Sequence, residues 1–168
     1  MRILISVILF STHFQSIKLP DWFAKAFNSQ KLNERYTIIN HIKPYFLEAD
    51  FNGDKINDVA VQIINKASKK KGVLIINGGS GKHCIFGAGF KFDNEDFSDT
   101  NWLNGWHIYR KSIAYKTLIN SDGDIIGGKK VKISHPAINI YATEDGEEYA
   151  GQLIYWNGLK YVSIHQGE

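Results

Sequence analysis

The sequence is short of several features that define large protein classes. Among its 168 residues there is one cysteine, Cys84, so no intramolecular disulfide can form. The formal net charge of +3 is too small to indicate nucleic-acid binding. The six histidines are scattered, without a His-x-x-x-His or His-Glu-x-x-His spacing, which argues against a zinc enzyme. No apolar run approaches the roughly 20 residues that a membrane-spanning helix needs.

Aromatic and apolar residues, by contrast, are plentiful. The chain has 4 Trp, 8 Tyr and 10 Phe, and this aromatic content favours β structure. Its 43% hydrophobic and 22% charged residues are ordinary for a globular protein, and its length suits one domain. We therefore predict a mainly β (α+β) fold, a single antiparallel β-sheet domain over residues 17–168 with a short N-terminal helical segment.

The first 16 residues have the composition of a signal peptide. Arg2 supplies a positive charge, and residues 3–10 form an apolar run of the length of a signal-peptide core. Cleavage near Ser16 is expected, although Phe14 is bulky for the position three residues before the cut. The alternative is a buried N-terminal strand. Export to the periplasm or the medium is the prediction.

Residues 19–30 predict a short helix. Asp21 follows Pro20 and is expected to cap the helix, and the apolar side chains at helical spacing are Trp22, Phe23, Ala26 and Phe27. Residues 31–44 fit either a second short helix or a strand. From Tyr45 onward the chain is expected to form strands separated by polar or glycine-rich turns.

The last two predicted strands carry the clearest local signal. Asn157-Gly158 separates two aromatic and β-branched runs, which is typical of a hairpin with a two-residue type I′ turn. Such a turn pairs Trp156 with Leu159. It also pairs Ile154 with Tyr161 and Leu153 with Val162.

The segment EADFNGDKINDVAVQI places oxygen-bearing side chains at alternate positions ahead of an apolar strand. In the acidic loop, residues 50–58, positions 1, 3, 5 and 9 are Asp50, Asn52, Asp54 and Asp58, and the carbonyl of Ile56 lies at position 7. With water, these oxygens meet the six to eight ligands that calcium prefers. The alternative is a polar turn without an ion, but closely packed carboxylates repel one another. We predict one structural calcium ion here.

This loop resembles the calcium loops of FG-GAP repeats in integrin-type β-propellers and of the related VCBS repeats. Their pattern is Asp-x-Asn-Gly-Asp-Gly-x-x-Asp followed by an apolar strand, over about a dozen residues. Lys55 replaces the second glycine, so we expect it at positive φ, at a cost of about 1–2 kcal/mol and with lower calcium affinity. The chain is also similar to small exported bacterial proteins with one such loop and a terminal YWNG-x-x-Y hairpin. That resemblance implies no particular activity.

Other candidate chemistry is weaker. GGSGKH departs from the phosphate-binding loop, because Ile76 and His83 replace a required glycine and a hydroxyl residue. Cys84 is expected to be a small core residue. The alternative to a non-catalytic function is a hydrolase that uses the acidic residues Glu95, Asp96 and Asp99. The pair Asp122 and Asp124 is expected in a turn.

Aromatic residues of the second half could also form a carbohydrate-binding surface or belong to a β core: Trp102, Trp106, Tyr155, Trp156 and Tyr161. The resulting prediction is a non-catalytic binding or envelope-associated module with a carbohydrate or protein ligand, and without nucleic acid or a transmembrane span.

Overall fold

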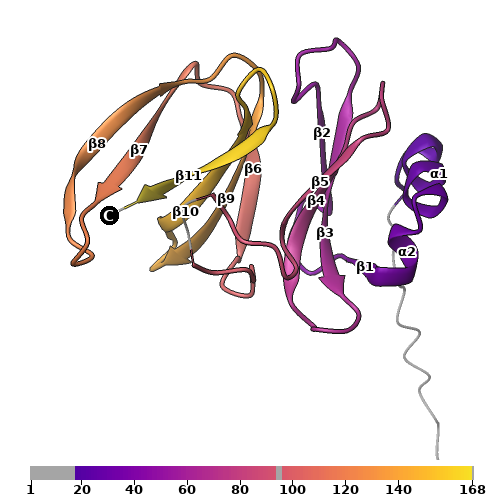
Figure 1. The fold of residues 1–168 in the computed structure, drawn as a ribbon, viewed down its shortest axis with the longest axis horizontal. Helices are drawn as coiled ribbons and strands as arrows, with labels where there is room; N and C mark the ends of the chain where they lie inside the picture. Colours follow the sequence, from indigo (N-terminus) through magenta and orange to yellow (C-terminus); the bar gives the residue numbers. More distant parts are fainter. Residues whose placement is uncertain (1–17, 94–95, 168) are drawn as a thin grey trace, which may run out of the picture.

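The computed structural model describes residues 18–93 and 96–167, and in these ranges the chain is mostly strand with two short helices (Figure 1). The helices are α1 Asp21–Ser29 and α2 Leu32–Arg35. The strands are β1 Tyr36–Ile39, β2 Phe46–Ala49, β3 Asp58–Asn65, β4 Lys71–Ile76, β5 His83–Gly87, β6 Gly105–Tyr109, β7 Ile113–Ile119, β8 Ile125–Lys132, β9 Ala137–Glu144, β10 Glu147–Trp156 and β11 Tyr161–Gly167. The predicted mainly β fold with a short helical segment is confirmed. The predicted signal peptide lies outside the described residues.

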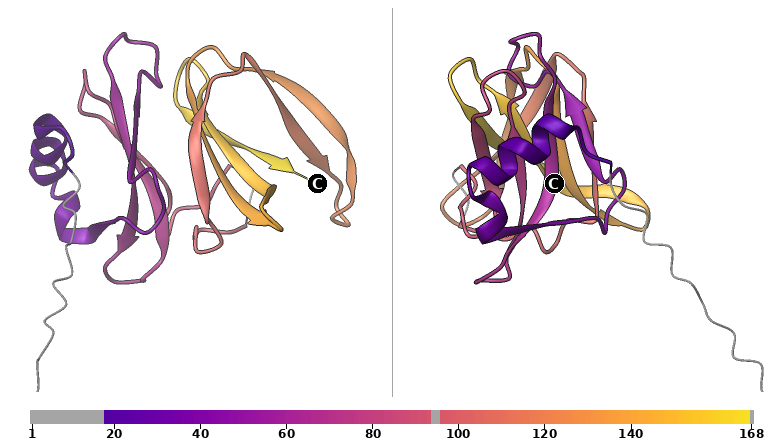
Figure 2. Two further views of the ribbon diagram at one scale, coloured as in Figure 1. Left: turned by 180° about the vertical axis from the view of Figure 1, so that it is seen from behind. Right: turned by 90° about the vertical axis from the view of Figure 1, so that its right-hand side faces the viewer.

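The strands form two facing sheets and a separate hairpin. In the first sheet the order is β1-β3-β4-β5, and β2 pairs with the other half of β3. The second sheet has the order β11-β10-β9-β6, and β7 pairs with β8. Figures 1 and 2 show the resulting succession of layers: helices, first sheet, second sheet, β7–β8 hairpin. All the ladders are antiparallel, both between consecutive strands and in the non-consecutive pairs β1 with β3 and β6 with β9.

The helices cover the outer face of the first sheet. Phe23 and Phe27 are buried against alternate residues of β3, which are Val59, Val61 and Ile63. Apolar side chains spaced three to four residues apart on the helix therefore pack against apolar side chains spaced two residues apart on the strand, and together they form one layer. The expectation that Asp21 caps α1 is wrong: Pro20 is the N-cap, Asp21 is already helical, and no side chain caps the helix.

Residues 31–44 combine the two predicted alternatives. The single turn of α2 ends at Arg35, and β1 begins at the next residue, where Tyr36 pairs with Asn65. Leu32 and Tyr36 are both buried in the helix-facing core. The local sequence favours neither helix nor strand clearly. The burial of these two side chains decides where the helix ends and the strand begins.

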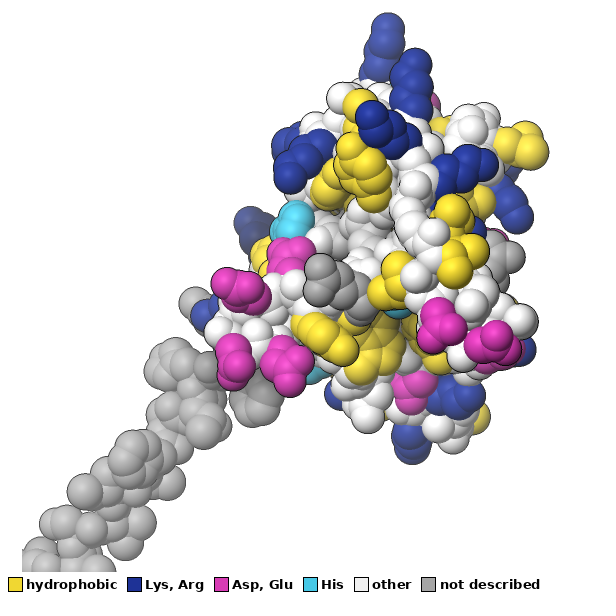
Figure 3. Space-filling model, turned by 90° about the vertical axis from the view of Figure 1, so that its left-hand side faces the viewer, with side chains coloured by type: hydrophobic (Ala, Val, Ile, Leu, Met, Phe, Trp, Pro, Cys, Tyr) yellow, Lys and Arg dark blue, Asp and Glu magenta, His cyan; other side chains and the backbone are white. Residues whose placement is uncertain are grey.

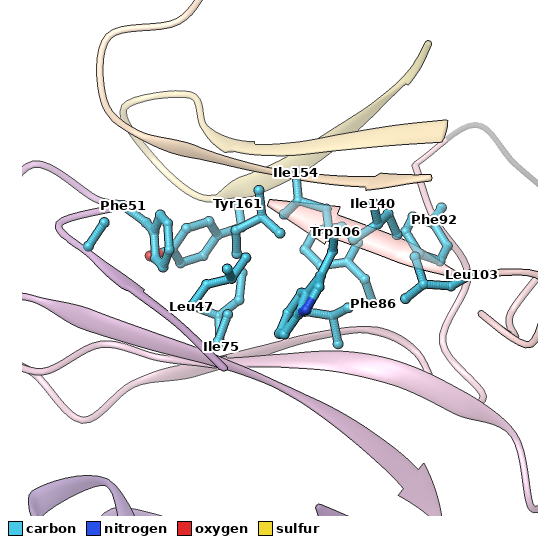
Figure 4. Packing of buried hydrophobic residues seen from close by; sticks show 14 of the residues in the cluster. Leu47, Phe51, Ile75, Phe86, Phe92, Leu103, Trp106, Ile140, Ile154 and Tyr161 are labelled. Atoms are coloured by element: carbon cyan, nitrogen blue, oxygen red, sulfur yellow. The ribbon is translucent and has the colours of Figure 1, made fainter. Parts of the chain in front are cut away.

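A second apolar layer lies between the two sheets. Figure 4 shows Leu47, Ile75 and Phe86 of the first sheet facing Trp106 and Ile154 of the second. Trp106 is 2% exposed, and its indole Nε1 donates a hydrogen bond of 2.6 Å to the carbonyl of Pro44. Since both faces of the first sheet are covered, its central strands contain near-continuous apolar runs.

The terminal hairpin exists, but its predicted register is wrong by two residues. Trp156 pairs with Tyr161, Ile154 with Ser163 and Leu153 with Ile164. The connection is a four-residue loop closed by a hydrogen bond from the amide of Asn157 to the carbonyl of Lys160. The side-chain carbonyl of Asn157 accepts the amides of Leu159 and Lys160, at 3.0 and 2.9 Å. This Asx turn replaces the type I′ turn and leaves Leu159 82% exposed.

The β7–β8 hairpin packs on the second sheet through a smaller cluster that contains Ala114, Ile133 and Leu153. The side chains of Thr117 and Gln166 also link β7 to the end of β11. Within the described ranges, neither helix has the length and apolar character needed to cross a membrane.

Candidate metal centre

The acidic loop joins β2 to β3 and is held by hydrogen bonds between its side chains and its own backbone. The carboxylate of Asp50 accepts the amides of Gly53 and Lys55, at 2.6 and 2.9 Å. The side-chain oxygen of Asn52 accepts the amide of Asp54 at 2.8 Å, and Asp54 accepts the amide of Ile56 at 2.8 Å. Each side chain at positions 1, 3 and 5 is therefore folded back over the same short loop.

The conformation of Lys55 agrees with the prediction for this position. Its φ is +70°, in the left-handed region that usually favours glycine, and Gly53 has a φ of +82°. The Lys55 side chain is exposed. The glycine-to-lysine replacement therefore keeps the loop shape and adds backbone strain and a nearby positive charge.

Asp58, at position 9, differs from the other loop residues because it is fully buried. Its Oδ2 accepts hydrogen bonds from the amides of Phe51 and Asn52 and from the hydroxyl of Tyr161. Its Oδ1 accepts the amide of Gly78 at 3.1 Å. This carboxylate ties the acidic loop to the β4–β5 turn and to β11.

Burial raises the pKa of the Asp58 carboxyl above its ordinary value, although the amides of Gly78 and Phe51 and the Tyr161 hydroxyl oppose the shift. The negative charge of Asp54 raises the pKa of Asp58 further. Burial and the Asp58 charge in turn raise the pKa of Tyr161, so its hydroxyl remains protonated and can donate. The loop therefore contains electrostatic repulsion that a cation would relieve.

Several partners of the loop come from distant parts of the chain. The Tyr161 hydroxyl lies 3.1 Å from Asp58 and 3.0 Å from the side-chain oxygen of Asn77. The imidazole of His135 lies so close to Gly53 that a Cβ there would come within 2.2 Å of the ring. The sequence contains no signal for these contacts, since Tyr161 and Asp58 are 103 residues apart.

The oxygens of the acidic loop suit calcium by type, but they are not gathered into a finished coordination shell. In the described part of the chain, no group of three or more His, Cys, Asp or Glu side chains is arranged to hold a metal ion. Asp54 and Ile56 are exposed and Asp50 is half-buried, whereas Asp58 is fixed by its four donors. Calcium binding would therefore require the side chains at positions 1, 3 and 5 to turn inward toward Asp58.

The acidic residues of the hydrolase alternative have separate partners. Asp96 is fully exposed and forms a 2.9 Å ion pair with Lys91, which lowers the pKa of Asp96. Asp99 instead accepts the amide of Lys71 at 2.9 Å, at the start of β4. Glu95 lies outside the described residues. No paired carboxylates are formed by Asp96 and Asp99, and the hydrolase stays a prediction.

The candidate aromatic surface is divided among different environments. Trp106 and Tyr161 are buried in the core between the sheets, and Trp102 packs edge-on against Phe97. Tyr155 packs against the smaller cluster below the β7–β8 hairpin. Trp156 and Tyr161 both line a cleft of about 290 Å³, together with Lys82, Cys84 and Lys160. The five side chains therefore do not form one carbohydrate platform.

Cys84, the GGSG segment and the pair Asp122 and Asp124 lie against a core, in a turn and in a second turn, respectively. Cys84 packs against the core between the sheets, and burial raises the pKa of its thiol to about 11. The GGSG segment is a turn between β4 and β5 and is followed by a strand. The Asn120 side chain accepts the amides of Asp122 and Asp124, which confirms the turn predicted there.

With the geometry of the loop described, the chain can be compared with known proteins. No family model, curated protein or solved structure matches it.

Proposed function

We propose that this is an exported, non-catalytic binding or envelope-associated protein whose acidic loop binds one structural calcium ion. Asp50, Asn52, Asp54 and Asp58 supply side-chain oxygens, and Ile56 supplies its carbonyl. The observation that carries the proposal is the hydrogen-bonded loop itself. Three oxygen-bearing side chains at positions 1, 3 and 5 are folded over one short backbone segment. The fourth, Asp58, is buried and electrostatically coupled to Asp54.

Calcium at this point would act on stability rather than on chemistry. Asp58 already connects the acidic loop to Gly78 and Tyr161, and so to both sheets. An ion bound to Asp58 and to the side chains at positions 1, 3 and 5 would fix the rest of the loop to that connection. Because calcium would bind the folded chain and not the unfolded one, its binding free energy would add to the free energy of unfolding.

The test is thermal unfolding in excess calcium and in chelator. At about 100 times its dissociation constant, calcium should add about 2.7 kcal/mol to the free energy of unfolding. Asp54→Ala should remove that increment while leaving stability in chelator almost unchanged, because Asp54 is exposed.

Asp122→Ala is the matched control, since Asp122 is an exposed aspartate in a different Asx turn. This variant should keep the full calcium increment. Identical melting curves for the wild-type protein in calcium and in chelator would return the acidic loop to the role of a polar turn.

A further inference from the structure

Exposed apolar side chains gather on the β7–β8 hairpin. Ile125 is 52% exposed and Ile126 is 64% exposed, at the start of β8. On β7 the exposed apolar side chains are Ile113, Tyr115 and Ile119, each at least 47% exposed. These five are more than half of the large apolar side chains that are exposed in the described residues. Such a cluster on one hairpin is characteristic of an interaction surface.

The same hairpin has a net positive charge larger than that of the whole chain. Between residues 110 and 132 there are six Lys and Arg residues and two Asp residues, a net charge of +4, against +3 for the whole chain. Neither ion pair found among the described residues involves this segment. Figure 3 shows this face of the molecule, with basic side chains (dark blue) close to exposed apolar ones (yellow).

The register places lysines directly beside the apolar side chains. Ile113 pairs with Lys132, and Tyr115 pairs with Lys130. The intervening residue Ala114 is buried against the second sheet, so Ile113 and Tyr115 lie on the opposite, outward face. The outer face of the hairpin is therefore a mixture of apolar and cationic side chains.

One pair on the hairpin is unfavourable in the isolated protein. Lys116 lies directly across from Lys129, and like charges in that position destabilise a two-stranded ladder. By alternation both lysines share the face of Ala114 and Val131, whereas Lys130 and Lys132 lie on the outer face with Ile113 and Tyr115. Charge and exposed apolar area thus both point to a partner that is anionic and has an apolar interior.

We propose that the β7–β8 hairpin docks on an anionic phospholipid surface. Its isoleucines would enter the boundary between headgroups and acyl chains, Tyr115 would lie at the interface, and the lysines would contact lipid phosphates. This inference deepens the proposed envelope association, but it involves no residue of the acidic loop.

Other partners fit the surface less well. A second copy paired along the free edge of β8 would bring Lys129, Lys130 and Lys132 against their own counterparts, and edge lysines oppose such pairing. Single-stranded nucleic acid is bound largely by aromatic stacking, but four of the five exposed side chains here are isoleucines.

The experiment is co-sedimentation of the full-length protein with vesicles of phosphatidylcholine alone or mixed with phosphatidylglycerol. We expect binding only to the anionic vesicles, weakened by high salt. Lys130→Gln with Lys132→Gln, the two lysines of the outer face, should lower the partition coefficient about 25-fold, or roughly fivefold per lysine. Ile125→Ser with Ile126→Ser should lower it about tenfold, because apolar area no longer enters the bilayer.

Matched controls are Lys25→Gln with Lys69→Gln, which removes the same charge elsewhere, and Leu159→Ser, which removes an exposed apolar side chain elsewhere. Both should bind like the wild-type protein. All variants keep residues 1–17, so that the N-terminal apolar run contributes equally to each. Circular dichroism should show the same fold in all of them.

Running the assay in chelator, and again in calcium, separates this proposal from that of the calcium loop. Equal binding to both vesicle types, or equal binding by the hairpin variants and the controls, overturns it. So does a dimer that the hairpin substitutions disperse, or binding to single-stranded DNA without binding to vesicles.

Discussion

At the scale of single residues, Asp58 has a structural role in addition to the calcium-ligand role proposed for it. Four donors satisfy its carboxylate inside the protein, yet burial still raises its pKa. The cost of desolvating the charge, together with the repulsion from Asp54, is therefore larger than the compensation from its hydrogen bonds. Asp54 has the same carboxylate but is exposed to water. Removing the Asp54 carboxylate would therefore leave no buried hydrogen-bond donor without a partner.

The contrast predicts different effects of two alanine substitutions in chelator. Asp58→Ala should lower the free energy of unfolding by about 3 kcal/mol, because the amides of Phe51 and Gly78 lose their charged acceptor. Asp54→Ala should change it by less than about 0.5 kcal/mol. Urea denaturation measures both values. A stability of Asp58→Ala equal to that of the wild-type protein would contradict the role of Asp58 as the anchor of the loop.

At the scale of elements, the terminal hairpin shows where a strong local signal is insufficient. Asn-Gly indicates a turn, but Asn157 uses its side chain to accept two amides and forms a longer loop. The longer loop pairs Tyr161 directly with Trp156, and their rings stack edge to face at 5.1 Å. In this register the Tyr161 hydroxyl, at the start of β11, reaches Asp58 at the start of β3. The hairpin thus contacts a strand of the other sheet.

Gly158 is the residue of this loop that most needs to be glycine. Its φ is +97°, and a Cβ there would meet no heavy atom within 4 Å, so that any cost is conformational. Gly158→Ala should therefore lower the free energy of unfolding by about 1–2 kcal/mol in thermal or urea denaturation. Gly128→Ala is the control, because Gly128 lies in a strand outside the positive-φ region, and it should change stability by less than about 0.5 kcal/mol. Equal effects of the two substitutions would be inconsistent with the strained geometry at Gly158.

At the scale of the whole molecule, the layers show where the packed part of the described chain begins. The helical layer begins near Leu19, which packs with Trp22 against the core that Phe23 and Phe27 share with β3. Residues before Lys18 lie outside the described part. The predicted cleavage site near Ser16 precedes every residue of this described packing.

Export predicts a new N-terminus between about residues 16 and 20 in the native protein, as signal peptides are removed on export. Mass spectrometry of protein purified from the periplasm and the medium should find it, and the processed form should melt at the temperature of the full-length chain in the same buffer. An intact Met1 on protein from the native host would contradict export.

The sequence by itself determined the elements whose evidence is local. Alternating Val59, Val61 and Ile63 predicted β3, the helical spacing of Phe23 and Phe27 predicted α1, and the replacement of glycine by Lys55 predicted positive φ. These features depend on neighbours within a few residues, and short-range sterics and periodicity are sufficient to specify them.

Only the tertiary structure decided what those elements contact. The division of the strands between two sheets, the register at Tyr161, and the contacts of Asp58 with Gly78 and Tyr161 join residues 20 to 103 positions apart. Contacts at such separation follow from which buried surfaces fit together and which buried polar groups find partners, and no short window of sequence contains both members of a pair.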